Sequence, residues 1–437
     1  MIILSRFRTG LKPIGGKWPY RRSAGRTFEP FYVLSAAALA GFGVLLVNLA
    51  QQESWVLPAL TTFLVLAITF GLMLAGIWVG APTATPLLLA TSSVLTALGF
   101  VTIYRLDQDQ AGRQVWWLLL SAGLAWLWIV EVKHGFLENQ HRLSMGLLFL
   151  ALGLIALPVL EVDADLTLVA WSTDPSVFFH PGPIVLLVAV FLFASFLANQ
   201  QDALIELRWS SVFFPSRRSF LATTIGLLLI LVGTALRDPG TALLLLGLFL
   251  VMAYLASNRP VFLIGGLLGL AGLVVLIVLS AGADGYSLIW TDPLSQPDNA
   301  VFSSAPGLFA LGSGEIFGVG LGQGSPHLIP EATTSLVIAV IGEELGLVGS
   351  VLTIVAYSLV VLTGFGLALR ARGIFHKLVA AGLSLLMGSQ LALSAAAAIG
   401  LAPTAIPIPF LSYGLSLNMA GFMVLAILAR ISHLEHL

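Results

Sequence analysis

The chain has 437 residues, of which 58% are hydrophobic and only 9% are charged. Soluble domains carry about 25% charged residues, so this composition excludes a protein that faces water on all sides and indicates a lipid bilayer as the main solvent. The net charge of −1 gives no reason to expect nucleic acid as a partner, and the absence of Cys excludes disulfides and thiolate chemistry.

The first 30 residues form a polar segment ahead of any apolar run. They contain seven Lys and Arg residues and no apolar stretch before Phe31, so they do not have the pattern of a cleavable signal. We predict that residues 1–30 are a basic cytoplasmic tail, which the membrane surface would also attract.

Apolar runs fill most of the remaining chain. Runs of ~20 apolar residues match the length of a membrane-spanning helix, and only helices or closed barrels satisfy their backbone hydrogen bonds inside lipid. The sequence therefore predicts an all-α polytopic membrane protein with about 12 transmembrane helices. The twelve candidate spans are 31–50, 55–79, 86–104, 114–130, 143–160, 182–198, 219–236, 241–256, 260–280, 346–369, 378–400 and 409–429. Neighbouring runs such as 219–236 and 241–256 could instead form one broken helix.

The distribution of basic residues predicts the orientation of these spans. Seventeen of the twenty Lys and Arg residues lie in the tail or in loops on its side of the membrane, and only Arg105, Arg113 and Arg237 lie opposite. Because basic residues concentrate on the cytoplasmic side, both termini are predicted to be cytoplasmic and loop 281–335 extracytoplasmic. Apolar stretches inside this long loop favour a folded, functional segment over a flexible linker.

Two pairs of ionisable residues lie close to the ends of spans, where charges are costly and often functional. Arg237 and Asp238 precede a Pro-Gly pair, which is also typical of a simple turn. Glu343 and Glu344 point ~100° apart on a helix, so they cannot face each other as an acid and a base. One carboxylate could reach a cavity while the other pairs with a basic residue or a backbone donor, or both could simply be stabilised at a helix start.

Several segments resemble, in order, the motifs of one known protein family. Segment 330–346 resembles the motif Pro-Glu-Ala-His-Thr-Asp followed by Gly-Glu-Glu-Leu-Gly, and segment 409–414 resembles Pro-Phe-Ile-Ser-Tyr-Gly. Segment 238–242 resembles Asp-Leu-Gly-Thr-Ala. The family is the SEDS family of cell-wall proteins (FtsW, RodA and SpoVE). The glycine-rich stretches 310–314 and 318–324 resemble part of its large extracytoplasmic loop, while Tyr104–Asp107 and Arg113-Gln114 look like the opening of its core.

The resemblance implies a SEDS-like ten-helix core over residues 86–437, with residues 31–85 as two additional N-terminal spans. It implies a bacterial plasma-membrane protein of peptidoglycan assembly, acting in cell shape or cell division. The implied ligand is lipid II or another polyprenyl-linked precursor, and the implied partner is a penicillin-binding transpeptidase. No cofactor is expected, apart from a divalent cation at the leaving diphosphate if the chain is active.

The chain departs from the family at the position of the proposed catalytic residue. The family motif ends in Asp, whose carboxylate could take the proton from the acceptor hydroxyl, whereas this chain has Ser335 there. A Ser hydroxyl without an adjacent base cannot do this near neutral pH. Segment 180–183 also lacks the carboxylate of the family's Gln-Pro-Ser-Glu. The sequence therefore predicts a catalytically impaired homologue of the lipid II glycan polymerases.

Two alternatives remain open. The first is an active glycosyltransferase with a displaced carboxylate, such as Glu331 or Glu315. Glu331 would share a face with Ser335 on any helix in that segment. The second is a flippase or transporter of a polyprenyl-linked precursor, which a broken helix near 237–240 would suit. The remaining candidate site residues are Arg237, Asp238, Glu343, Glu344, Ser412 and Tyr413 for substrate binding, and the loop glycines Gly312, Gly314, Gly320, Gly322 and Gly324.

Overall fold

The computed structural model describes residues 28–51, 56–131, 160–163, 166–169, 179–199, 239–260, 305–402 and 405–435, together with a few residues between 262 and 271. Within these residues, nine helices are long and apolar enough to cross a membrane. They are α2 (Glu29–Gln51), α3 (Val56–Gly80), α4 (Pro86–Leu106), α5 (Gln108–Glu131), α7 (Pro181–Asn199), α11 (Pro239–Ser257), α15 (Val337–Arg370), α16 (Ile374–Ala398) and α17 (Leu415–Leu434).

Short elements complete the described chain. Strands β1 (Leu160–Asp163) and β2 (Leu166–Val169) form an antiparallel hairpin. Helix α14 (Ala305–Gly314) and the 3₁₀ turn η2 (Pro326–Leu328) lie in the long predicted loop, so the described part of that loop is folded.

The all-α polytopic architecture is confirmed. Nine of the predicted spans correspond to the nine long helices. The other three, 143–160, 219–236 and 260–280, lie largely outside the described residues, so the total of twelve stays a prediction.

Two helix starts differ from their predicted positions for reasons of backbone geometry. Helix α15 begins at Val337 rather than at 346, and a non-helical Gly346 (φ 70°, ψ −167°) divides it. Helix α17 begins at Leu415 rather than at 409, because Phe410 (φ 72°) and Gly414 (φ 140°) have left-handed backbone angles that a helix does not contain.

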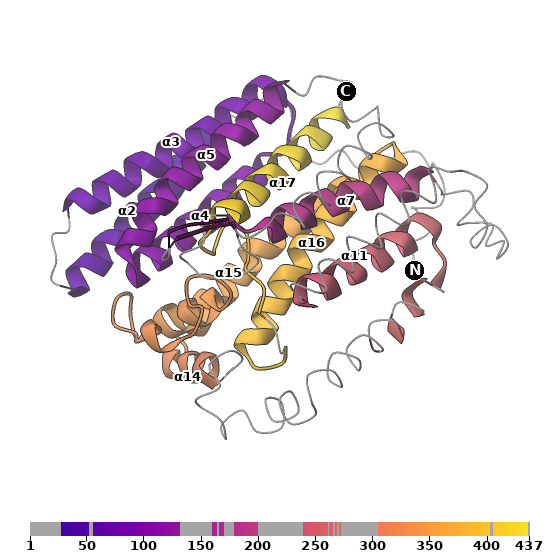
Figure 1. The fold of residues 1–437 in the computed structure, drawn as a ribbon. Coiled ribbons are helices and arrows are strands. Elements are labelled where there is room, and N and C mark those ends of the chain that lie inside the picture. The colour runs from indigo at the N-terminus through magenta and orange to yellow at the C-terminus, as the bar shows by residue number, and fades with distance from the viewer. Residues whose placement is uncertain are drawn as a thin grey trace.

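The long helices form one bundle (Figure 1). Helices α2, α3, α4 and α5 pack on one another, and this group joins the rest through α4 against α15 and α5 against α17. Helices α7, α11, α15 and α16 complete the other half. Large apolar side chains such as Phe31, Leu57 and Leu362 remain exposed on outer faces, as expected for surfaces that contact lipid tails.

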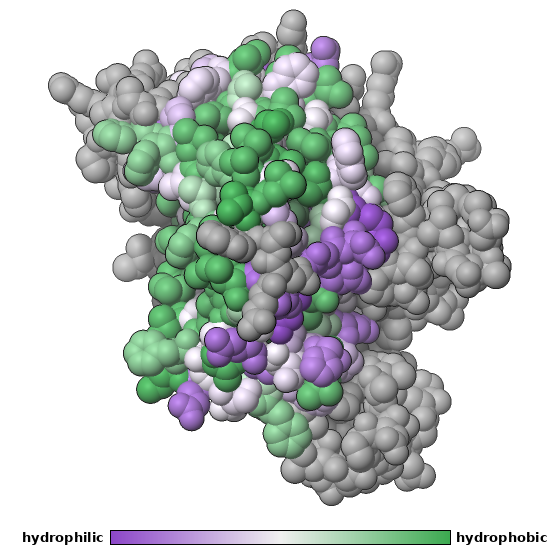
Figure 2. Space-filling model, turned by 90° about the vertical axis from the view of Figure 1, so that its left-hand side faces the viewer, coloured by the Kyte–Doolittle hydropathy of each residue, from purple (hydrophilic) through white to green (hydrophobic). Residues whose placement is uncertain are grey.

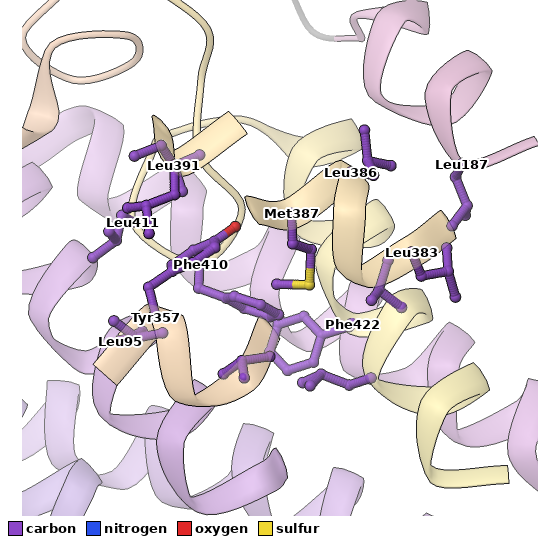
Figure 3. Close-up of a cluster of buried hydrophobic side chains, with 14 of the residues drawn as sticks. Leu95, Leu187, Tyr357, Leu383, Leu386, Met387, Leu391, Phe410, Leu411 and Phe422 are labelled. Atoms are coloured by element: carbon purple, nitrogen blue, oxygen red, sulfur yellow. The ribbon is translucent and has the colours of Figure 1, made fainter. Parts of the chain in front are cut away.

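The core lies where the two halves meet (Figure 3). Leu95 of α4, Tyr357 of α15 and Met387 of α16 are buried there with Phe422 of α17. The Phe422 ring stands edge-on to that of Phe410, with centroids 6.0 Å apart. Phe410 belongs to the segment 405–414, so the core directly supports the loop in front of α17.

Polar contacts mark two ends of this bundle. At one end, Arg430 of α17 donates to the carbonyl oxygen of Gly80, and His433 lies 2.7 Å from the hydroxyl of Thr83. At the other end, Arg105 pairs with Glu344 and Arg113 contacts Tyr413. In the predicted topology, the helix ends that meet at each of these two places lie on the same side of the membrane. Which end faces the cytoplasm stays a prediction.

Candidate functional site

The second of these ends, which we call the polar end, gathers the α4–α5 junction, segment 315–336, the start of α15 and segment 405–414. The side of the molecule that lies to the left in Figure 1 carries hydrophilic residues in its middle and lower part, between hydrophobic patches (Figure 2). The polar end holds the candidate site residues that the structure describes, apart from Gly312 and Gly314, which lie in α14 next to it.

Glu344 is buried near the start of α15, with only 4% of its side chain exposed, and forms an ion pair. Its Oε1 atom accepts a hydrogen bond from Nε of Arg105 at 3.0 Å. Arg105 lies at the end of α4, and its Nη2 atom also donates to the carbonyl oxygen of Gly324 at 3.1 Å. The guanidinium therefore holds together α4, α15 and the glycine-rich segment.

Glu343 is also buried, at 7% exposure, but has a different partner. Its Oε1 atom accepts a hydrogen bond from the backbone N–H of Ser325 at 2.8 Å. Its Oε2 atom has no hydrogen-bond partner among the described residues. The Oε2 atom of Glu344 accepts a hydrogen bond from the N–H of Gly322 at 3.2 Å, so each carboxylate holds the backbone of the glycine-rich segment. Glu344 also has a basic partner, Arg105.

The candidate glycines belong to a packed segment. Gly312 and Gly314 lie in α14, and a Cβ atom at Gly314 would be 1.9 Å from the carbonyl oxygen of Gly342. Only glycine therefore allows α14 to approach α15 this closely. Further along, Gly322 lies against Ala50 of α2, while Gly320 and Gly324 provide further backbone contacts to this network.

The segment that ends in Ser335 forms turns rather than a helix. Ser335 is fully buried, and its hydroxyl has no hydrogen-bond partner among the described residues. Its carbonyl oxygen accepts a hydrogen bond from Ser394 of α16 at 2.9 Å. Glu331 is exposed and has a left-handed backbone (φ 51°). Because the segment is not a helix, the helix face that Glu331 and Ser335 would have shared does not form.

Ser412 joins this segment to the loop before α17. Its hydroxyl donates to the carbonyl oxygen of Thr334 and accepts from the N–H of Ile408 at 3.0 Å. Next to it, the N–H of Tyr413 donates to the carbonyl oxygen of Thr333 at 2.8 Å. Two motifs that are far apart in sequence therefore lie against each other, held by the Ser412 hydroxyl and by a backbone hydrogen bond of Tyr413.

The side chain of Tyr413, in the loop before α17, contacts α5. Arg113 of α5 donates from Nε to its hydroxyl at 2.9 Å, and the ring lies 4.7 Å from that of Trp117. Burial raises the pKa of the Tyr413 phenol, and the Arg113 guanidinium offsets part of that rise. The phenol therefore stays protonated at neutral pH.

The family model for FtsW, RodA and SpoVE, described as "Cell cycle protein", matches residues 82–437. The chain belongs to the FtsW/RodA/SpoVE family. A curated relative, the peptidoglycan glycosyltransferase RodA of Mycobacterium tuberculosis, is 32% identical over 440 residues, which cover 95% of this chain and 91% of the relative. The stage V sporulation protein E of Bacillus subtilis is 28% identical over 321 residues, covering 72% of this chain and 85% of that protein.

Solved structures of this family share the fold. The RodA crystal structure from Thermus thermophilus aligns with a TM-score of 0.55 at 19% identity, covering 80% of this chain and 96% of that one. A second structure, described as "Structural coordination of polymerization and crosslinking by a peptidoglycan synthase complex", aligns with a TM-score of 0.63 at 22% identity and covers 81% of this chain and 98% of that one. This FtsW/RodA/SpoVE chain is thus a multi-pass membrane protein with the fold of these relatives.

The structure adds three side chains to the candidate site of this FtsW/RodA/SpoVE chain. Arg105 and Arg113 contact Glu344 and Tyr413, and Gln114 accepts a hydrogen bond from the N–H of Gly414 at 3.3 Å. The signal was present in the sequence, because these residues lie in the stretches that resemble the opening of the family core. Arg237 and Asp238 lie outside the described residues, so their predicted role stays a prediction.

Metal binding has no ready-made site in the part of the chain that the structure describes. In that part, no three or more His, Cys, Asp or Glu side chains lie close enough together to hold an ion. The exposed carboxylates at the polar end are those of Asp109, Glu315 and Glu331.

Proposed function

We propose that this chain is a plasma-membrane protein of peptidoglycan assembly in which the glycan-polymerising chemistry of its family is impaired. The observation that carries this proposal is the environment of Ser335, which stands where the family has its Asp. The residue is fully buried, and its hydroxyl has no hydrogen-bond partner among the described residues. Among the residues that the structure describes, no His or Lys bonds to this hydroxyl, and a Ser hydroxyl without such a partner cannot act as a base near neutral pH.

The role in peptidoglycan assembly rests on the relatives. Several are named peptidoglycan glycosyltransferases, including the mycobacterial RodA proteins that align with most of this chain. The hydrogen bonds between segments 330–335 and 408–414 support a retained scaffold. The chain would bind lipid II or another polyprenyl-linked precursor at the polar end, facing the outside of the cell. A penicillin-binding transpeptidase would be its partner, as a structural relative described as a peptidoglycan synthase complex suggests.

A displaced carboxylate gives the second candidate function, an active glycosyltransferase. Glu331 is exposed at the polar end, four residues from Ser335 in the chain. Its left-handed backbone directs the chain away from a helix. An exposed carboxylate could act as a base if the acceptor hydroxyl reached it. A precursor flippase is the third possibility from the sequence, and no described contact favours it.

The test is a lipid II polymerisation assay on the purified full chain, with and without a candidate penicillin-binding partner. A family member that carries the Asp is the positive control, and lipid II binding is measured in parallel. We expect binding without strand synthesis, and we expect Ser335→Asp to restore synthesis if the remaining site is intact.

The variants separate the two candidate functions. Strands from the unmodified chain would contradict the impaired-enzyme proposal. Their loss in Glu331→Ala, with retention in the matched Glu315→Ala, would establish the displaced carboxylate. Absence of lipid II binding would contradict the proposed ligand.

A further inference from the structure

The glycine-rich segment 318–325 directs its backbone N–H groups inward. Six of its eight N–H groups donate hydrogen bonds to acceptors within the protein. The pairs are Gly318 to the carbonyl of Gly314 (2.7 Å), Val319 to that of Glu343 (3.0 Å), Gly320 to that of Glu344 (3.1 Å), Gly322 to Oε2 of Glu344 (3.2 Å), Gln323 to the carbonyl of Gly320 (3.1 Å) and Ser325 to Oε1 of Glu343 (2.8 Å).

This arrangement differs from that of a phosphate-binding loop. Glycine-rich loops that hold phosphates aim several free backbone N–H groups at the anion. Here four of the six donors are bound to Glu343 and Glu344, two of them by the carboxylates themselves. A diphosphate at this segment would have to displace two buried carboxylates. The segment is therefore built as a collar around Glu343 and Glu344.

Arg105 closes the collar. It pairs with Oε1 of Glu344 and donates to the carbonyl oxygen of Gly324, with 15% of its side chain exposed. The two carboxylates are buried in one cluster, and the guanidinium of Arg105 places a positive charge 3.0 Å from that of Glu344. The planar guanidinium donates in two directions at once, which a Lys ammonium on its flexible stem does less well.

We propose that Arg105 is a positioning residue that acts through Glu344 to keep segment 318–325 closed around Glu343 and Glu344 at the polar end. Arg105 itself is not expected to touch the ligand. The link to a ligand rests on the proposed function, whereas the closure of the segment does not. The closed collar would leave recognition of a lipid-linked precursor to other groups at the polar end.

Hydrogen exchange of the full chain in lipid nanodiscs, without ligand, tests this proposal. We expect Arg105→Gln and Glu344→Gln each to speed exchange across 318–325 by about tenfold or more, because each leaves a buried charge without its partner. The double variant should exchange more slowly than either single variant, since both charges are then removed. Arg105→Lys should give an intermediate rate.

Matched controls make the same chemical changes at exposed positions outside the site. Arg370→Gln at the end of α15 and Glu131→Gln at the end of α5 should leave exchange of 318–325 unchanged. A merely structural role would lower the melting temperature and raise exchange throughout α4 and α15. That result, or unchanged exchange in the two single variants, would overturn the proposal. If the unmodified chain does not bind lipid II, that result contradicts the proposed function and leaves this proposal standing. The two are separable because the hydrogen-exchange experiment contains no ligand.

Discussion

The hydroxyl of Ser412 takes part in two hydrogen bonds. This buried hydroxyl donates to the carbonyl oxygen of Thr334, 78 residues away in the chain, and accepts from the N–H of Ile408. A buried backbone N–H or C=O group that loses its hydrogen-bond partner still carries the full free-energy cost of its removal from water. One small side chain therefore satisfies polar groups on both of the segments that form the candidate site.

Ser412→Ala should lower the free energy of unfolding by about 1–3 kcal/mol, because it leaves a buried donor and a buried acceptor without a partner. The measurement is the melting temperature of the purified protein in detergent. The control is Ser389→Ala, whose hydroxyl only donates to the carbonyl of Leu386 in its own helix. Its loss should cost about 0.5 kcal/mol or less. Equal decreases in melting temperature for the two variants would show that the hydrogen bond to Thr334 does not stabilise the protein.

At the scale of elements, the break in α15 decides where the glycine-rich segment fits. The helix is interrupted at Gly346 (φ 70°), and a Cβ atom there would lie 2.3 Å from the backbone nitrogen of Gly318 and 2.5 Å from the carbonyl oxygen of Ile316. The next N–H groups, those of Leu347 and Val348, donate to the carbonyls of Glu315 and Ile316. The kink thus opens one turn of the helix to the backbone of residues 315–318.

Gly346→Ala should destabilise the protein by more than about 3 kcal/mol, since the substitution combines an unfavourable φ with a backbone clash. We expect a large drop in melting temperature or failure to recover folded protein. Gly366→Ala is the control in the same helix, because its Cβ would meet nothing within 4 Å. It should leave the melting temperature unchanged or slightly higher. A normal melting temperature for Gly346→Ala would mean that the kink is not required.

At the scale of the whole molecule, polar contacts occur at both ends of the bundle, but different residues make them at each end. One end joins Thr83, Arg372 and the last turn of α17, and the other holds the candidate site. The excess of Lys and Arg near the first end predicts that it faces the cytoplasm. The site then faces outward, where a lipid-linked cell-wall precursor would be used.

Cysteine labelling can test this orientation directly, because the chain contains no Cys. Gln323 and Arg372 are exposed at opposite ends of the bundle. We expect a membrane-impermeant maleimide to label Gln323→Cys in intact cells and Arg372→Cys only after the membrane is permeabilised. The reverse pattern would overturn the predicted topology.

The spans were predictable because the signal for each of them is local. Lipid forces an apolar run of sufficient length into a helix, so nine helices appear where the apolar runs predict them. Their ends were less predictable near Gly346 and Phe410, where backbone angles depend on the neighbouring segments. The motifs at 330–346 and 409–414, which the sequence singled out by resemblance, lie against each other in the structure, and their role as a binding site stays a prediction.

By itself, the sequence determined the membrane class, the helical architecture and the loss of a carboxylate at Ser335. Only the tertiary structure decided which polar groups meet. Arg105 and Glu344 are 239 residues apart in the chain, and Arg113 and Tyr413 are 300 apart. The tertiary structure also placed Ser335 in the interior and Glu331 on the surface. The physical reason is that such contacts depend on how whole helices pack, which no local pattern of residues specifies.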